Sequence, residues 1–341
     1  MWPFFVINCI YLCLFVSLFK MSKNILVTGA TGFLGSALVK RFCSMSDVSV
    51  IAPLRNINKE LPDSVKKIHI SDINESTDWT LALVDVSVVV HSAARVHIMY
   101  EDPAQSMKKF RDVNVRGTLN LARQSIDAGV KRFIFISSIK VNGEVTAPGR
   151  AFAADDTPAP SDPYAISKFE AEQQLLQLAS TGELEVVIIR PVLIYGAGVG
   201  ANFNQMMHWL AKGLPLPFGA VNNCRSLVSL DNLVDLVKTC IDHPQAANQV
   251  FLVSDDEDVS TTQLMQRLIS HLGVKTWLVP IPVNVLVFLA GLFGRRASAQ
   301  RLFGSLQVDI RKNRELLAWN PPSSLEDGLK STAQDFLEFR K

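Results

Sequence analysis

The chain has 341 residues, of which 48% are hydrophobic and 19% charged, so it can form one large or two modest domains with a full core. Its formal net charge is +2 and it has no long basic run, which argues against a nucleic-acid partner. The five cysteines show no metal-ligand spacing and leave one over in any disulfide scheme, which favours a reducing compartment. They are Cys9, Cys13, Cys43, Cys224 and Cys240.

An almost wholly apolar segment, residues 2–19, opens the chain and is closed by Lys20. Its length is just enough for a membrane helix, and no basic n-region or clear cleavage site marks it as a secretory signal. Two interpretations stay open. Residues 1–20 are a membrane anchor, or translation starts at Met21, which runs directly into the first predicted strand. We favour the second, and we expect a cytoplasmic protein that is attached to a membrane through residues 2–19 only if they are translated.

A glycine-rich turn joins the first predicted strand, residues 25–27, to a predicted helix at 36–46. Its glycines, Gly29, Gly32 and Gly35, are spaced G-x-x-G-x-x-G. They permit a sharp turn, a close approach of a ligand to the backbone, and tight packing of the helix on the sheet. The start of the helix then presents free N–H groups to a pyrophosphate. A turn without a ligand is the simpler alternative, but the flanking strand and helix favour a dinucleotide site.

Strands and helices alternate over the first 190 residues, which predicts an α/β fold with a doubly wound parallel sheet. The expected strands are 48–54, 65–70, 86–90, 132–138 and 185–190, with helices at 104–129 and 164–180. After residue 191 the pattern changes to helices at 201–213, 231–243 and 260–273, with one strand near 250–254 returning to the sheet. We therefore expect a dinucleotide-binding domain over 21–190 and a smaller mixed lobe over 191–341.

Residues at the ends of three predicted strands are candidates for cofactor contacts. Arg55 follows the second strand, where an acidic residue would select NAD, and an arginine there can bind the 2′-phosphate of NADP. An ordinary surface arginine is an equal alternative. Asp72 is placed to meet an adenine edge. The small residues 92–94 leave room for the cofactor, whereas His91 has no partner motif and is expected to be a packed histidine.

Tyr164 and Lys168 stand four residues apart in a predicted helix, so their side chains share one helix face. A free tyrosine has a pKa of about 10, and a nearby positive charge would lower it enough to exchange a proton at an alcohol carbon. Lys168 can also hold the ribose beside the nicotinamide. Ser138 ends the preceding strand, at the ligand-binding edge of a parallel sheet, and can share the substrate oxygen with Tyr164. A surface Tyr/Lys pair and a loop serine are the plainer alternatives.

The glycine turn, the strand-end serine and the Y-x-x-x-K pair are together far more specific than any one alone. With them, the chain resembles the extended short-chain dehydrogenase/reductase family, in its nucleotide-sugar epimerase and reductase branch. The resemblance runs from about residue 24 to the C-terminus. Its further marks are Asp72-Ile73, residues 114–118, Ser137-Ser138, Arg190-Pro191, Tyr195-Gly196, and residues 225–231, 319–321 and 325–329.

The resemblance implies roles for particular residues. It makes Ser138, Tyr164 and Lys168 catalytic, and it implies NADP or NAD as cofactor. The expected cofactor contacts are Gly29, Gly32, Phe33, Leu34, Gly35, Arg55, Asp72, Ile73, Ala93, Asn114, Tyr164, Lys168 and Pro191. A UDP-sugar substrate is expected at Ser138, Asn202, Phe203, Arg225 and Arg301, and the arginines would contact its diphosphate. The likeness also suggests a homodimer, and no metal site is expected.

Two departures from the family pattern bear on the reaction. Family dehydratases place an Asp-Glu pair directly after the strand-end hydroxyl residue, whereas Ile139 and Lys140 stand here, so we reject a dehydratase. Many epimerases read Val-Tyr-Gly where this chain has Val141, Asn142 and Gly143, which weighs against simple UDP-galactose epimerisation.

Residues 137–143 resemble most the bacterial enzymes that reduce or oxidise C4 of UDP-N-acetyl sugars for surface polysaccharide such as O-antigen. With Arg55, this resemblance makes an NAD(P)-dependent reductase or dehydrogenase acting at C4 of a UDP-linked, N-acetylated hexose the leading interpretation. The alternative is a UDP-sugar 4-epimerase that keeps NAD bound. A dinucleotide sensor without catalysis is the least favoured, because the Ser138, Tyr164 and Lys168 set is intact.

A second apolar stretch, residues 283–294, precedes Arg295 and Arg296. Its length suits a core helix better than a membrane span. The alternative is an interfacial patch that brings the protein to a membrane surface.

Overall fold

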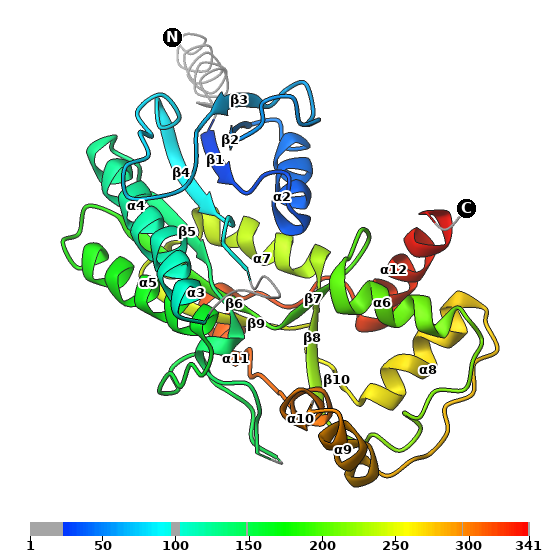
Figure 1. Ribbon diagram of the computed structural model, residues 1–341. Coiled ribbons are helices and arrows are strands. Elements are labelled where there is room, and N and C mark those ends of the chain that lie inside the picture. Colours follow the sequence, from blue (N-terminus) through cyan, green and yellow to red (C-terminus); the bar gives the residue numbers. More distant parts are fainter. Residues whose placement is uncertain (1–22, 97–102, 148, 295, 340–341) are drawn as a thin grey trace, which may run out of the picture.

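A seven-stranded parallel sheet forms the centre of the molecule (Figure 1). The structure, a computed structural model, describes residues 23–96, 103–147, 149–294 and 296–339. The strand order is β3-β2-β1-β4-β5-β6-β9. The strands are β1 (Lys23–Thr28), β2 (Val48–Leu54), β3 (Lys66–His69), β4 (Val86–His91), β5 (Arg132–Ile136), β6 (Glu185–Pro191) and β9 (Gln249–Val253). The predicted doubly wound fold is thus confirmed. The order reverses between β1 and β4, and sheets of this kind bind ligands at that point, outside the carboxyl ends of the strands.

Helices cover both faces of the sheet because its central strands are apolar on both sides. On one face lie α2 (Phe33–Cys43) and α7 (Leu230–Asp242), and on the other α3 (Pro103–Phe110), α4 (Thr118–Asp127) and α5 (Pro163–Ala179). Strand β1 illustrates the alternation. Ile25 and Val27 pack with Leu38 of α2, whereas Leu26 packs with Leu121 and Leu175 of α4 and α5.

The C-terminal lobe contains a small sheet of β7 (Leu193–Tyr195), β8 (Arg225–Ser229) and β10 (Asp258–Val259). Its helices are α6 (Ala201–Leu210), α8 (Thr261–Leu272), α9 (Val283–Leu292), α10 (Arg296–Phe303), α11 (Arg311–Leu317) and α12 (Leu325–Phe339). A buried polar cluster ties the lobe to the sheet. The Tyr195 hydroxyl donates to Asp255 Oδ2 at 2.7 Å, and Asn232 Nδ2 donates to Asp255 Oδ1 at 2.6 Å. The strand near 250–254 returns to the sheet as predicted, and the division at residue 190 stays a prediction.

The predicted helix 104–129 is interrupted by a π-helical segment at residues 111–117. Gly117 ends this segment against Ile73, and a Cβ at Gly117 would lie 2.8 Å from the Ile73 side chain. The wider turn also directs Asn114 inward, where it is 1% exposed. Such bulges often occur at functional sites, and periodicity alone does not reveal them.

The apolar stretch 283–294 forms α9, but the expectation that it is a core helix is wrong, because none of the helix residues is buried. The helix packs against α10 at the edge of the lobe, and its other sides stay at least partly open (Figure 1). Within the described parts of the chain, no helix has both the length and the apolarity to cross a membrane. The apolar residues 1–20 lie outside the described residues.

Substituting Gly35 with alanine should damage the fold at the glycine turn. An added Cβ would lie 2.0 Å from the carbonyl oxygen of Gly29, so α2 must move away from the sheet. We expect a loss of about 1–3 kcal/mol in the free energy of unfolding, measured by urea denaturation, together with weaker dinucleotide binding. Gly200→Ala is the control, because a Cβ there meets nothing within 4 Å. Equal stability of the two variants would contradict the packing argument.

Candidate active site

The glycine turn between β1 and α2 has the geometry of an anion-binding cradle. Gly29 has φ +72°, and a Cβ on it would lie 2.9 Å from the backbone nitrogen of Ala93. Helix α2 begins at Phe33, three residues earlier than predicted, and its N-cap residue Gly32 makes no side-chain capping bond. The first N–H groups of the helix are therefore open to a ligand. These residues fit the pyrophosphate of a dinucleotide, although their role stays a prediction.

The residues predicted for the adenosine end meet beside β2 and β3. A cavity of about 480 Å³ is lined by Asp72 and Ile73, together with Arg95, Arg116 and residues of the α3 region. The Asp72 carboxylate accepts from the backbone nitrogen of Ile73 at 2.8 Å and lies 3.8 Å from the Arg55 guanidinium. Arg55 is thus near the expected ribose position, but it already faces an anion on the protein.

Ser138, Tyr164 and Lys168 come together at the carboxyl end of β5. Lys168 is 1% exposed, and its Nζ donates to the carbonyl oxygen of Ile136 at 2.8 Å while lying 4.4 Å from the centre of the Phe135 ring. This contact ties α5 to the last residue of β5. Strand β5 ends two residues before Ser138, earlier than predicted, and Ser138 accepts a bond from the backbone nitrogen of Lys140 at 3.3 Å. The fold therefore brings the two predicted hydroxyls to one edge of the sheet.

The predicted lowering of the Tyr164 pKa is wrong for this structure. Burial, and after it the negative charge of Asp162, raise the pKa of Tyr164 to about 12. Burial also lowers the pKa of Lys168 to about 7, against a smaller opposite effect of Glu172. Burial thus makes the Lys168 ammonium easier to deprotonate, and the group points to the Ile136 carbonyl and not to the Tyr164 hydroxyl. A sequence pattern gives the spacing of two side chains but not their burial or their third partners.

Asp162 is a residue that the sequence analysis missed. It is the N-cap of α5 and accepts from the backbone nitrogen of Ala165 at 2.7 Å. Its other carboxylate oxygen binds Lys140 Nζ at 2.5 Å. Burial raises the pKa of Asp162, but the Lys140 and Ala165 bonds outweigh it, so the net shift is downward. An aspartate directly before a proline and a helix is a recognised capping signal, and it could have identified this residue.

A buried ion pair lies one turn after Lys168 on the same helix. Arg190 contacts Glu172 through Nε at 3.0 Å and Nη2 at 2.5 Å, and both side chains are at most 5% exposed. Arg190 also donates to Asn142 Oδ1 at 2.9 Å. Asn142, the departure from the Val-Tyr-Gly pattern, is 2% exposed and therefore changes the packing beneath the site.

Two other buried polar residues hold the end of β4. His91 bonds to Thr28 at 2.7 Å and to Thr118 at 2.9 Å, as expected for a packed histidine. Asn114 donates to the carbonyl oxygen of Arg95 at 3.1 Å and to Ser167 Oγ at 3.0 Å. Asn114 thus joins the segment after β4 to α5, and its part in ordering the site stays a prediction.

The predicted phosphate-binding arginines are neighbours in the lobe. Arg225 Nη1 donates to the carbonyl oxygens of Arg301 and Gly304, both at 3.1 Å, and burial lowers its pKa. The Arg301 guanidinium is 49% exposed and lies 3.3 Å from Glu144 of the loop after β5. The structure therefore brings the two segments together, with Arg301 reaching toward the Rossmann side.

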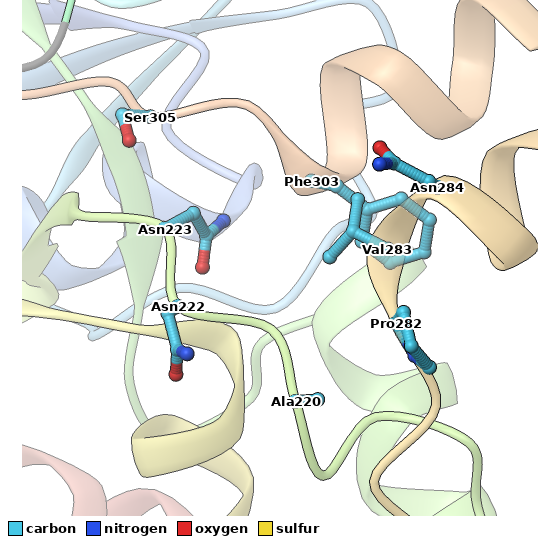
Figure 2. A pocket seen from close by; sticks show the side chains of 8 residues that line it. All are labelled: Ala220, Asn222, Asn223, Pro282, Val283, Asn284, Phe303 and Ser305. Atoms are coloured by element: carbon cyan, nitrogen blue, oxygen red, sulfur yellow. The ribbon is translucent and has the colours of Figure 1, made fainter.

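A cavity of about 510 Å³ lies next to these arginines. Figure 2 shows its wall, which consists of Ala220, Asn222 and Asn223 from one loop, Pro282, Val283 and Asn284 at the start of α9, and Phe303 and Ser305 at the end of α10. Asparagine and serine groups beside an aromatic ring suit a polar ring system. Of the weaker substrate candidates, Asn202 is exposed, whereas the ring of Phe203 stacks on Tyr195 at 5.6 Å in the core of the lobe.

Comparison with known proteins identifies the family. A family model described as the NAD dependent epimerase/dehydratase family matches residues 25–254. The chain belongs to this family. A UDP-glucose 4-epimerase of Vibrio cholerae is 52% identical over 321 residues, which cover 94% of this chain and 97% of the relative.

Two further relatives of this epimerase/dehydratase chain are more distant. An N-acetyl-alpha-D-glucosaminyl-diphospho-ditrans,octacis-undecaprenol 4-epimerase of Escherichia coli O157:H7 is 28% identical, over 94% of this chain and 98% of the relative. The solved structure of a Thermotoga maritima UDP-glucose 4-epimerase with UDP-glucose is 25% identical, has a TM-score of 0.73, and covers 93% of this chain and all of that one. The chain is thus an NAD-dependent enzyme of the epimerase/dehydratase kind, and the expected family branch is confirmed.

Asp162→Asn should lower the pKa of Tyr164. Asparagine keeps an oxygen for the Ala165 N–H but removes the charge that disfavours the phenolate. We expect the limb of the kcat/KM pH profile that reports Tyr164 to move to lower pH by up to about one unit. Lys140→Met removes the cation beside Asp162 and should move the limb the other way. A shift of both variants in the same direction would refute this account.

Protonation of His91 should contribute to acid unfolding. Burial, with the charge of Lys168, lowers the pKa of His91 to about 3, below its unfolded value near 6.5. The stabilisation is therefore complete above about pH 6.5 and is lost as the pH falls toward 3, by up to about 1.4 kcal/mol per pH unit. Urea denaturation between pH 6.5 and 4 should show that the free energy of unfolding depends less steeply on pH in His91→Gln than in the parent protein. Exposed His69→Gln is the control and should match the parent.

Proposed function

We propose that the protein is a UDP-hexose 4-epimerase that retains NAD between turnovers. The observation that carries the proposal is the 52% identity to the Vibrio cholerae UDP-glucose 4-epimerase, which extends over 94% of the chain. The convergence of Ser138 and Tyr164 at the carboxyl end of β5 supports it, because this is the edge where sheets of this order bind ligands. Of the two interpretations left by the sequence, these findings favour the epimerase over the reductase.

In this proposal the hydroxyls of the chain manage the proton at the sugar O4. Tyr164 takes the O4 proton as the C4–H bond breaks and returns a proton to O4 when that bond re-forms on the other face. Ser138 donates a hydrogen bond to O4 and keeps it near the phenol. Bound NAD would accept and return the C4 hydride, and its oxidised ring would add a positive charge that favours the Tyr164 phenolate.

The cofactor would lie across the switch point of the sheet. The glycine turn and the start of α2 would hold its pyrophosphate, and the cavity beside Asp72 and Ile73 would take its adenosine end. The Arg225 and Arg301 segments would hold the substrate diphosphate, with the cavity of Figure 2 next to them for the base. Arg55 would then be a surface residue paired with Asp72, and NAD is the expected cofactor.

The purified protein distinguishes an epimerase from a reductase. We expect co-purifying NAD by mass spectrometry and inversion at C4 of UDP-glucose or UDP-N-acetylglucosamine, without net change in absorbance at 340 nm. Stoichiometric consumption of NADPH with a 4-keto sugar would instead establish the reductase.

Tyr164→Phe tests whether the phenol carries the proton. We expect the inversion rate to fall by about 10²–10⁴-fold with the fold and NAD content unchanged. Phe288→Tyr is the matched control, because it also changes an aromatic ring by one hydroxyl group, but at an exposed position of α9, which lies away from β5 (Figure 1). This variant should keep the parent inversion rate. Full activity of Tyr164→Phe would remove this residue from the mechanism.

The same inversion on a lipid-linked sugar diphosphate is a second candidate. The 28% identity to the Escherichia coli O157:H7 enzyme that acts on an undecaprenyl diphosphate sugar supports it, as does the open apolar surface of α9. The reacting sugar would be the same and only its carrier would differ. Comparing kcat/KM for UDP-N-acetylglucosamine and for N-acetylglucosaminyl diphosphate on a short polyprenol identifies the preferred carrier.

A further inference from the structure

Helix α9 presents its most exposed apolar side chains at the spacing that a surface helix normally turns toward the core. Val285, Phe288, Leu289 and Leu292 stand at i, i+3, i+4 and i+7, and they are 44%, 66%, 45% and 67% exposed. Phe293 directly after the helix is 80% exposed, and Leu302 of the adjacent α10 is 52% exposed. We call these six side chains the α9 face.

The side of α9 that faces the protein does not bury the apolar residues of the helix. The ten residues of the helix contain no charged side chain, and none of them is buried. A helix that is apolar all round is normally surrounded by protein or lipid. Figure 1 shows α9 at the rim of the lobe, where α10 is the neighbouring helix. Contiguous exposed apolar surface of this kind marks a binding surface.

The charge of the surrounding chain indicates what covers the face. Residues 259–308, which include α8, α9 and α10, contain five Lys or Arg residues and no Asp or Glu. The loop residues 220–223, which face the start of α9 across the cavity in Figure 2, also lack Asp and Glu. Acidic residues from elsewhere reach only part of this region, because Glu257 and Glu326 pair with Arg267, and Glu144 pairs with Arg301.

We propose that the α9 face docks on the surface of an anionic lipid bilayer. Large apolar side chains with flanking Lys and Arg are the composition of helices that lie in the membrane interface. Arg295 and Arg296 follow the helix in the sequence, and Lys275 and the 66% exposed Trp277 precede it. Tryptophan is enriched at this depth of a membrane.

The length of the helix defines how it would lie. Ten residues span about 15 Å, half of the roughly 30 Å hydrocarbon layer, so α9 would lie in the plane of the interface and not cross it. A second copy of the chain is the competing occupant. A two-fold contact through this face would set the same acid-free basic segments against each other, whereas an anionic bilayer complements them.

Docking would place the substrate lobe at the membrane. The cavity of Figure 2 is lined by Val283 and Asn284, the first residues of α9. The cavity would therefore lie at the N-terminal end of the docked helix. The catalytic edge at β5 belongs to the other part of the molecule, so docking is separable from the proposed reaction.

Hydrogen exchange read by mass spectrometry tests the proposal on the full chain, because it resolves α9 from the apolar residues 1–20. Vesicles of phosphatidylcholine with 30% phosphatidylglycerol should slow exchange in the peptide covering 283–294 at least threefold. Phosphatidylcholine vesicles should not, and 0.5 M salt should weaken the effect. The double variant Phe288→Ser, Leu292→Ser should abolish this protection. Leu81→Ser, a 73% exposed leucine in the loop before β4, is the matched control and should keep it.

Two results would overturn the proposal. One is unchanged exchange in 283–294 while the protein floats with the anionic vesicles, which would assign membrane binding to another segment. The other is protection of 283–294 without vesicles that increases with protein concentration, which would assign the face to a second copy. Epimerase activity is not the readout, so failure of docking leaves the proposed reaction untouched.

Discussion

The site depends on a lysine that the fold buries at the end of β5. An ammonium without water is costly unless it is well bonded, and Lys168 meets this need with the Ile136 carbonyl and the Phe135 ring. The same helix buries Glu172, which Arg190 neutralises. Breaking a buried pair of this kind typically costs about 3–5 kcal/mol, because one charge is left alone. The charged side of α5 is thereby locked against the sheet, and the position of Tyr164 follows from it.

Much of the framework could be predicted from the sequence because it is local. A glycine triplet between an apolar strand and a helix indicates a dinucleotide-binding turn. Alternating strands and helices are compatible with few topologies other than a doubly wound sheet. The order of Ser138, Tyr164 and Lys168 along the chain was enough to place the tyrosine and the lysine on one helix and the serine near the preceding strand, although that strand ends at Ile136. Predictions failed where the outcome depends on contacts between distant residues. The π-helical segment ends where Gly117 packs on Ile73, and the high pKa of Tyr164 arises from burial and Asp162.

In the C-terminal lobe, too, the sequence did not predict contacts between distant segments. Residues 225–229 were recognised as part of a family motif. The pairing of this strand with 193–195 and 258–259 could not be predicted from local sequence patterns. The apolar segment 283–294 was expected inside the molecule because hydrophobicity alone reports only a preference for leaving water. Whether an apolar helix is buried inside the protein depends on how much of its surface the rest of the chain can cover. Here α10 covers one side of α9, and none of the α9 residues is buried.

The ion pair between Lys140 and Asp162 has a mechanical consequence. Lys140 bonds through its backbone to Ser138, and Asp162 caps the helix that begins beside Tyr164. The ion pair therefore restrains the segment of Ser138 against the start of the Tyr164 helix. Substitutions confined to the lobe would leave this restraint in place, so the proposed sugar-binding surface could diverge while the proposed proton carriers keep their positions.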